Sequence, residues 1–329
     1  MSDPKKSKIL TVGMAQIAPV WLNRERTLDK IMEYVDAAAQ KGCELVAFGE
    51  ALLPGYPFWI EHTDGARFNS TIQKEIHAHY LHNAVQIEVG HLTRLCETTA
   101  KHKIAVVLGC IERPEDRGGH SIYASRIYID QNGDIGSVHR KLMPTYEERL
   151  TWSQGDGHGL RVHRIGSFLM GALNCWENWM PLVRAALYGQ GENLHIAIWP
   201  GGIHNTNQIT KFIAMESRSY VVSVSGLMRK TYFPPETPHL ETILEGCPDV
   251  LANGGSCIAG PDGEWVVEPV IDKEELIVAT LDYVAVLKER QNFDPAGYKG
   301  CVHQLPAVRS CHLKQHRERH QTKQQLSRL

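Results

Sequence analysis

Several features that would place this 329-residue chain in a special class are missing from it. Its eight cysteines form no C-x-x-C pair and have no spacing that suits a structural zinc site or a disulfide framework. No uncharged apolar run approaches the roughly 20 residues that a membrane-spanning helix needs. The apolar run at 9–15 is too short and too interrupted for a signal-peptide core. We therefore expect a soluble, cytoplasmic protein with reduced cysteines and no membrane partner.

An excess of charge of either sign is also missing. The 35 Lys and Arg residues stand against 37 Asp and Glu residues, which gives a formal net charge of −2. This balance provides no field that would steer nucleic acid toward the whole protein. Basic residues do gather near the end of the chain, and they leave nucleic-acid binding by a tail as a remote alternative (Lys314, Arg317, Arg319, Lys323, Arg328). The expected partner is a small molecule, with no nucleic acid.

The chain is not poor in apolar residues, and it contains no stretch that resembles a linker. The hydrophobic fraction of 43% is enough for a large core, which excludes a disordered or fibrous protein. Because no stretch resembles a linker, residues 1–303 are expected to form a single domain. Residues 304–329 are rich in Gln, His and Arg and have few apolar anchors. They are expected to form a tail that is disordered or is ordered by oligomer contacts.

Strand and helix patterns alternate along the chain, with hairpin turns between some of the strands. This alternation predicts a layered α/β fold with a mixed sheet. Residues 58–83 are weakly periodic and are interpreted as an insertion near the site, with a short helix or a contact surface. Residues 231–255, rich in Pro, Glu and Gly, are predicted to be a long loop over the pocket. Strands are predicted at 9–16, 44–48, 104–110, 121–130, 135–138, 162–165, 167–173, 195–200, 220–227, 256–259, 265–269 and 276–281, and helices at 27–41, 85–102, 207–218 and 283–290.

Residues 170–181 contain the first candidate for a catalytic residue. A small apolar run leads into Cys175, a polar and aromatic turn follows, and apolar residues then recur at helical spacing. A cysteine at the end of a buried strand, beside the N–H groups of a helix N-terminus, has the geometry of a nucleophile. Taken alone, such a cysteine is more often a core residue.

Glu50 and Lys141 occupy places like that of Cys175 in the predicted fold, because each follows a predicted buried strand and opens a loop. Side chains at strand ends of α/β folds converge on one site. A thiol with a pKa of about 8.5 needs a base or a positive charge before it attacks an electrophilic carbon. Glu50 can accept the proton and Lys141 can stabilise the charge that develops. Each of the two, taken alone, is more often a surface residue.

Three sequence motifs support a joint catalytic role for Glu50, Lys141 and Cys175. Gly49-Glu50, the heptapeptide at 139–145 and Asn174-Cys175-Trp176-Glu177-Asn178 resemble, in order and spacing, the catalytic motifs of the nitrilase (carbon–nitrogen hydrolase) superfamily. The resemblance implies a four-layer α-β-β-α sandwich with mixed sheets. Residues 54–57, 144–149, 152–157 and 175–182 are more similar to the nitrilase branch than to the amidases or carbamoylases of the superfamily.

The same resemblance implies roles for individual residues. Glu50, Lys141 and Cys175 match the catalytic triad, and Glu148 matches a second glutamate that positions substrate or water. Tyr56 and Trp176 match substrate-pocket positions. Glu177 is a further candidate for substrate contact and an alternative to Glu148 in that supporting role, although a carboxylate in the first turn of a helix explains it better.

The implied activity is hydrolysis of an organic nitrile to the carboxylic acid and ammonia through a cysteine thioimidate and an acyl-thioester. The alternatives are an amidase with the same triad and a catalytically silent filament-forming or binding protein. Trp176-Glu177-Asn178 disfavours a cyanide-degrading enzyme, which resembles Trp-Glu-His there. A homodimer or a larger homo-oligomer, including a spiral filament, is the expected assembly.

No cofactor and no metal are expected, since the covalent route needs only a thiol and proton transfers. Two histidine clusters, His77/His79/His82 and His312/His316/His320, are interpreted as solvated. Near its end the chain departs from the branch: residues 294–300 lack the Gly-His-Tyr and Arg-Pro-Asp that many nitrilases carry. The nitrile itself, whether aliphatic, aromatic or an arylacetonitrile, is left open by the sequence.

Overall fold

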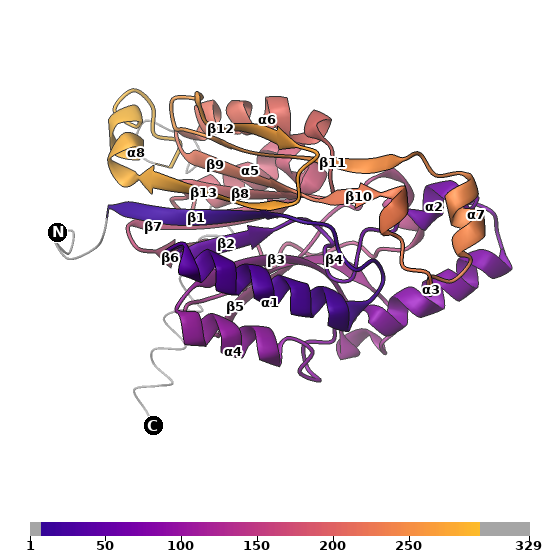
Figure 1. Cartoon of the computed structure of the whole chain (residues 1–329). Helices are drawn as coiled ribbons and strands as arrows, with labels where there is room; N and C mark the ends of the chain where they lie inside the picture. Colours follow the sequence, from indigo (N-terminus) through magenta and orange to yellow (C-terminus); the bar gives the residue numbers. More distant parts are fainter. Residues whose placement is uncertain (1–7, 297–329) are drawn as a thin grey trace.

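The computed structural model describes residues 8–296 and consists of two mixed sheets packed face to face (Figure 1). The first sheet has six strands in the order β13-β1-β2-β3-β4-β5. Its central strands β1, β2 and β3 are parallel, and the outer pairs are antiparallel. The strands are β13 (Glu275–Asp282), β1 (Ile9–Gln16), β2 (Leu45–Phe48), β3 (Ala105–Glu112), β4 (Tyr123–Ile129) and β5 (Ile135–Arg140).

The second sheet has the order β10-β11-β9-β8-β7-β6, with β12 paired to β11. Here β7, β8 and β9 are parallel, whereas the remaining strands pair antiparallel. The strands are β10 (Leu227–Arg229), β11 (Val250–Ala259), β9 (Tyr220–Ser225), β8 (Leu194–Trp199), β7 (Phe168–Asn174), β6 (His163–Ile165) and β12 (Trp265–Ile271). Both sheets are mixed, as predicted.

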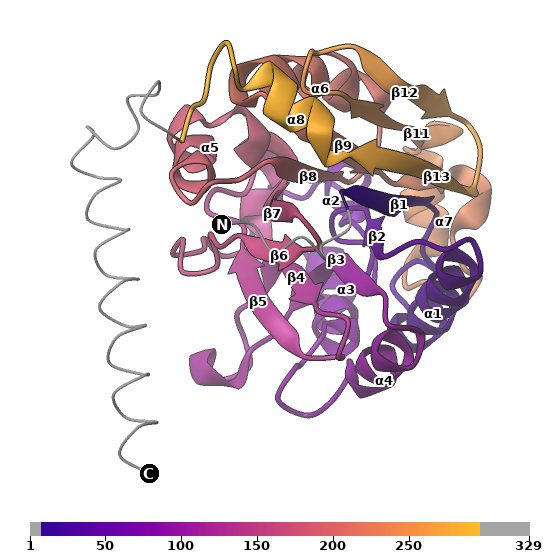
Figure 2. The same ribbon diagram turned by 90° about the vertical axis from the view of Figure 1, so that its left-hand side faces the viewer.

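The strand period of two residues divides the core into layers. On β2, Leu45 and Ala47 pack into the core between the sheets, whereas Val46 and Phe48 pack against the outer helices. Helices α1 (Arg24–Gln40) and α4 (Thr93–His102) cover the first sheet, and α6 (Ile203–Ser217) covers the second (Figure 2). The four-layer α-β-β-α sandwich is therefore confirmed.

Helix α1 shows how local chemistry and packing agree. It begins after Asn23, whose side chain accepts a hydrogen bond from Arg26 N, and Leu28, Ile31 and Val35 form its buried face. The remaining helices are α5 (Pro181–Tyr188), beside the second sheet, and α8 (Tyr283–Glu289), next to β13.

Three helices cluster at one end of the sandwich (Figure 1). They are α2 (Trp59–His62), α3 (Thr71–Asn83) and α7 (Leu240–Glu245). Trp59, Tyr80 and Ile243 pack with other aromatic residues in a core of their own. The insertion expected at 58–83 is thus two helices, and α7 of the region 231–255 lies against α2.

Two predicted elements were wrong in extent. The helix predicted at 85–102 is helical only at α4, because Val85 pairs with the end of β3: Val85 N donates to Ile111 O at 2.7 Å, and Arg113 N donates to Val85 O at 2.7 Å. The region 231–255 is not one loop, since it contains α7 and the first residues of β11. In the first case, pairing to the distant strand β3 overrode the local pattern.

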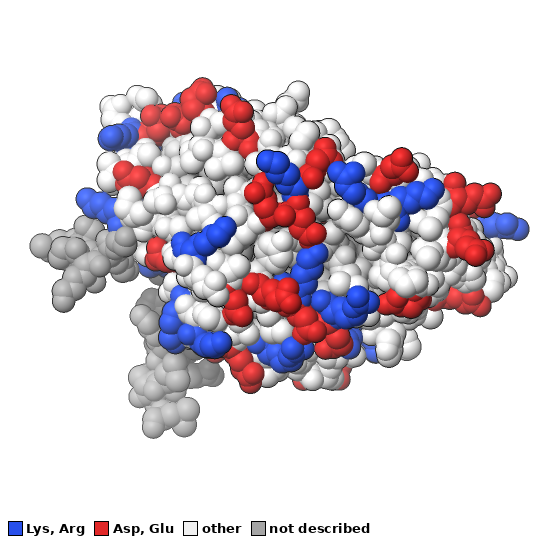
Figure 3. All heavy atoms as spheres, in the orientation of Figure 1, with Lys and Arg blue, Asp and Glu red and all other residues white. Residues whose placement is uncertain are grey.

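Lys and Arg side chains alternate with Asp and Glu over the face shown in Figure 3, as expected from the balanced composition. Within residues 8–296, no helix has both the length and the apolar character to cross a membrane. The tail expected at 304–329 lies outside the described residues.

Candidate active site

Cys175 comes directly after β7 and opens a short 3₁₀ helix, η3 (Cys175–Trp179), which leads into α5. The predicted order of strand, sharp turn and helix is therefore present. The backbone of Cys175 has φ 45°, in the left-handed region that residues with a side chain rarely adopt. Its side chain is 3% exposed. Such a backbone places the thiol at a bend rather than along a continuing strand.

Glu50 follows β2 with Gly49 between them, where the two sheets approach closely. Its backbone N donates to Trp199 O, at the end of β8, at 3.1 Å. Gly109 of β3 has no room for a side chain: a Cβ there would lie 2.2 Å from Gly49 O and 2.7 Å from Glu50 Cα. The glycine therefore allows Glu50 its position next to the second sheet.

Lys141 follows β5, and its fully buried ammonium lies between two carboxylates. Nζ is 3.0 Å from Glu50 Oε1 and 2.7 Å from Glu148 Oε2. The ring of Trp152 lies on another side, with its centroid 5.4 Å from Nζ. The positive charge is thus held by two carboxyl groups and an aromatic face.

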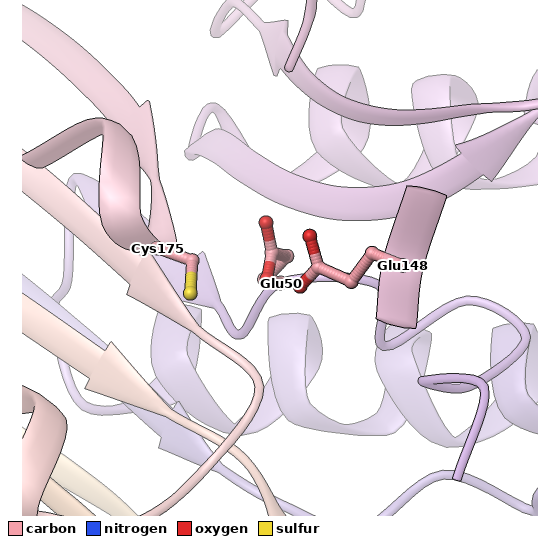
Figure 4. A group of neighbouring side chains, drawn as sticks. All are labelled: Glu50, Glu148 and Cys175. Atoms are coloured by element: carbon pink, nitrogen blue, oxygen red, sulfur yellow. The ribbon is translucent and has the colours of Figure 1, made fainter. Parts of the chain in front are cut away.

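Glu148 lies on the 3₁₀ helix η2 (Tyr146–Leu150), where it forms a capping box with Thr145. Glu148 Oε2 accepts from Thr145 N at 2.6 Å, and Glu148 Oε1 accepts from the Tyr56 hydroxyl at 3.0 Å. Both carboxylate oxygens are therefore held in place. Figure 4 shows Glu50 between Glu148 and Cys175, and ligand-type atoms of the three lie within 4.8 Å of one another.

The pKa values of this cluster are strongly perturbed. Burial raises the pKa of Glu50 to about 8; the Lys141 ammonium opposes the shift and the Glu148 carboxylate adds to it. Burial also raises the pKa of the Cys175 thiol, which Lys141 and the Trp176 N–H partly offset. Burial alone would lower the pKa of Lys141, but the surrounding anionic groups raise it above its usual value. The site therefore holds a thiol beside a strong carboxylate base and a permanent cation.

Glu50, Glu148 and Cys175 have donor types that metals bind. The ammonium of Lys141, however, already contacts both carboxylates. A metal ion would have to displace it. In the first histidine cluster, His77 and His79 contact different groups. His77 Nδ1 is 3.2 Å from Thr151 Oγ1, and His79 Nε2 is 3.2 Å from Leu22 O. The second cluster, at 312–320, lies outside the described residues.

The three residues expected to contact substrate lie in different surroundings. Tyr56 is next to the cluster, and burial together with Glu148 and Glu147 raises the pKa of its hydroxyl well above the usual value. Trp176 is 50% exposed and packs against Trp179, with 6.2 Å between the ring centroids. Its ring is turned toward the surface.

Glu177 is fully buried, and protein donors occupy its carboxylate. It accepts from Leu142 N at 2.7 Å and from Asn174 N at 3.0 Å, and each oxygen is 3.1 Å from His139 Nε2. The carboxylate thus joins the residue after Lys141 to the residue before Cys175. This geometry favours a positioning role for Glu177 over the expected substrate contact.

Sequence reasoning missed the second layer of polar residues behind the thiol. Asn178, His195 and Glu192 are buried, and they are linked to one another by hydrogen bonds. The signal for two of them was a glutamate and a histidine three residues apart, Glu192 just before β8 and His195 within that buried strand. Nothing in that pattern indicates which element they contact.

Comparison with known proteins identifies the family. The carbon–nitrogen hydrolase family model matches residues 11–289. An aliphatic nitrilase from Rhodococcus rhodochrous is 31% identical, covering 87% of this chain and 79% of the relative. An arylacetonitrilase from Aspergillus niger is 32% identical, covering 87% and 85%.

A solved structure of an amidase from Nesterenkonia sp. superposes with a TM-score of 0.61, covering 86% of this chain and 94% of the amidase. At 16% identity, that likeness shows the shared fold alone. The two sequence relatives are named as nitrilases, and their similarity to this chain covers most of the length of both proteins. The chain belongs to the carbon–nitrogen hydrolase family, within its nitrilase branch.

Proposed function

We propose that this protein hydrolyses an organic nitrile to the carboxylic acid and ammonia. The observation that carries the proposal is one buried cluster in which a thiol, two carboxylates and an ammonium lie within reach of one another. Such a cluster supplies a nucleophile, a base and a charge stabiliser in one place. The nitrilase names of the sequence relatives support the choice of substrate class.

The reaction begins with Cys175. Its sulfur adds to the nitrile carbon while its proton passes through Glu50 to the nitrile nitrogen, which gives a thioimidate. The raised pKa of Glu50 makes it a strong base for this transfer. Apart from its ion pair with Lys141, the Glu50 carboxylate accepts no hydrogen bond from the described residues, so it is available to the substrate.

Two waters complete the turnover. The first, deprotonated by Glu50, adds to the thioimidate carbon, and the resulting tetrahedral intermediate expels ammonia to leave an acyl-thioester. The second hydrolyses the thioester to the carboxylic acid and restores the thiol. Lys141 stabilises the negative charge that develops in these steps, and Glu148 holds Lys141 and orients substrate or water.

A direct test compares ammonia release from a panel of aliphatic, aromatic and arylacetonitrile substrates with release from the matching amides. We expect nitriles to turn over faster than amides. Faster turnover of the amides would assign the site to an amidase. No turnover of either, together with slow labelling of Cys175 by iodoacetamide, would indicate a silent binding protein. The relatives are named for different nitriles, so the panel also identifies the preferred substituent.

A candidate surface for contact between subunits of the expected homo-oligomer lies on η3, α5 and α6. Trp179, Leu182, Phe212 and Met215 are exposed there, and Leu182 is 72% exposed. Arg184 of α5 joins the two helices through a bidentate ion pair with Glu216 of α6. Exposed apolar side chains on neighbouring elements favour a second copy of the chain as their partner.

Sedimentation of the Leu182→Glu variant tests this assembly. We expect it to shift the protein to smaller species, whereas Val89→Glu, at an exposed apolar residue elsewhere, should leave the assembly unchanged. Unchanged assembly in Leu182→Glu would place the contact on another surface. A cytoplasmic location and the absence of a nucleic-acid partner remain predictions.

A further inference from the structure

The Asn178 side chain contacts the unusual backbone of Cys175 directly. Asn178 Nδ2 lies 2.7 Å from Cys175 O and 3.5 Å from Leu173 O, so the amide closes the turn on itself. A left-handed residue with a side chain persists only where its surroundings hold it there. The orientation of the Asn178 amide is therefore a condition for the position of the thiol.

That orientation follows from the chemistry of its partners. The carbonyl of Cys175 is an acceptor only, so the NH₂ group of Asn178 must face it. Asn178 Oδ1 must then face His195 Nε2, which is 2.8 Å away. His195 Nε2 consequently carries a proton and donates it to Asn178.

Glu192 fixes the other side of the ring. His195 Nδ1 is 2.9 Å from Glu192 Oε1, a distance that requires a proton between the two atoms. Either an imidazolium faces a carboxylate or a neutral ring faces a carboxylic acid. In both cases Nε2 keeps its proton. A neutral ring protonated at Nδ1 would instead present a lone pair to Asn178 Oδ1, and the amide would have to turn away from Cys175 O.

The surrounding protein encloses these three groups. Glu192, His195 and Asn178 are each fully buried. A Cβ at Gly171 would lie 2.1 Å from Glu192 Oε1, so the glycine of β7 makes room for the carboxylate. Arg184 NH1 donates to Asn178 O at 2.6 Å and holds the backbone end of the same residue.

We propose that Glu192, His195 and Asn178 form a hydrogen-bond relay that holds Cys175 in its left-handed conformation and thereby directs the thiol toward Glu50 and Lys141. The three are positioning residues, because they act through the backbone of Cys175 and not on the substrate. The inference deepens the proposed function and rests on it in one respect: Cys175 must be the nucleophile.

A matched pair of substitutions separates this role from simple filling of the core. A glutamine at position 195 extends far enough to donate its NH₂ group from the position of Nε2, whereas an asparagine reaches only the position of Nδ1. His195→Gln therefore keeps the contact with Asn178, and His195→Asn keeps only the contact with Glu192. Both variants replace the same ring by an uncharged amide.

The readouts are the rate of Cys175 alkylation by iodoacetamide, which needs no nitrile turnover, and kcat and KM on a nitrile. For His195→Asn we expect alkylation and kcat to fall about tenfold to a hundredfold with KM nearly unchanged, the usual effect of a misplaced reacting group. His195→Gln should restore most of both rates. The control His163→Asn, on β6 of the sheet that also contains His195, loses a 2.7 Å hydrogen bond with Ser137 of β5 and should leave both rates unchanged.

Equal losses in the asparagine and glutamine variants at equal thermal stability would overturn the relay, because a structural role alone does not distinguish them. Unchanged alkylation in His195→Asn would overturn it as well. If His195→Asn does not fold, Asn178→Asp provides the same test, since a carboxylate cannot donate to Cys175 O. A wild-type protein that alkylates rapidly at Cys175 but hydrolyses no nitrile would refute the proposed function and leave the relay standing.

Discussion

Replacing Lys141 by methionine removes the ammonium that contacts Glu50 and Glu148 and keeps most of the side-chain length. Lys141 is completely buried, so water cannot take over its charge. Removing one donor that stabilises developing negative charge costs about 3 to 4 kcal/mol of barrier in acyl-transfer enzymes. We therefore expect kcat to fall about 150-fold to 1,000-fold, with 1.36 kcal/mol for each factor of ten.

The same substitution perturbs stability. Two buried carboxylates would lose the cation at 3.0 and 2.7 Å, and removal of one partner from a buried ion pair costs about 3 to 5 kcal/mol. Proton uptake by Glu50 limits this loss, because its pKa is already raised to about 8. Destabilisation should consequently be smaller at pH 6 than at pH 9.

The assay is ammonia release from a nitrile that the wild type hydrolyses, on protein whose folding is confirmed by circular dichroism and thermal unfolding. Lys211→Met provides a control, because that lysine is partly exposed and forms a surface pair with Glu264. A folded Lys141→Met variant with turnover within a factor of a few of the wild type would refute the assigned role of the ammonium.

Three further predictions follow from the same geometry. Below the Glu50 pKa of about 8 the base is protonated, so kcat/KM should fall about tenfold per pH unit as the pH drops; a profile that stays flat to pH 5 would assign the base elsewhere. Gly109→Ala should displace Glu50 and lower kcat at least about tenfold, since its Cβ would lie 2.2 Å from Gly49 O; unchanged kinetics would show that the sheets separate freely there. Tyr56→Phe removes a hydroxyl donor 3.0 Å from Glu148 and should lower kcat by about fivefold, the effect of one hydrogen bond of about 1 kcal/mol; a loss as large as that of Lys141→Met would mean that the hydroxyl takes part in the chemistry.

Elements whose pattern reflects their own burial could be predicted from the sequence. The strand predicted at 9–16 coincides with β1, and the apolar face of α1 is the face that packs on the first sheet. Val85 could not be placed in this way, because its backbone pairs with the end of β3, and periodicity carries no information about such pairing.

In the active site, too, some features could be predicted from the sequence and others could not. Glu50, Lys141 and Cys175 each follow a strand, and side chains at strand ends of α/β folds converge on one site, so their convergence was predictable. The sequence does not indicate that the strands before Glu50 and Lys141 belong to one sheet and the strand before Cys175 to the other. The hydrogen-bond partners of Glu177 could not be predicted, because they become neighbours only when β5 and β7 approach each other. Trp176 follows the nucleophile directly, but the tight 3₁₀ turn of η3 directs its ring outward.

The proposed mechanism depends above all on covalent bonding of the substrate carbon to Cys175. Mass spectrometry of protein quenched in acid during turnover of a nitrile measures this directly. We expect a thioimidate or acyl adduct on the peptide that contains Cys175, absent from Cys175→Ala and gone once the substrate is consumed. Nitrile hydrolysis that persists in Cys175→Ala, or an adduct on another residue, would contradict the account.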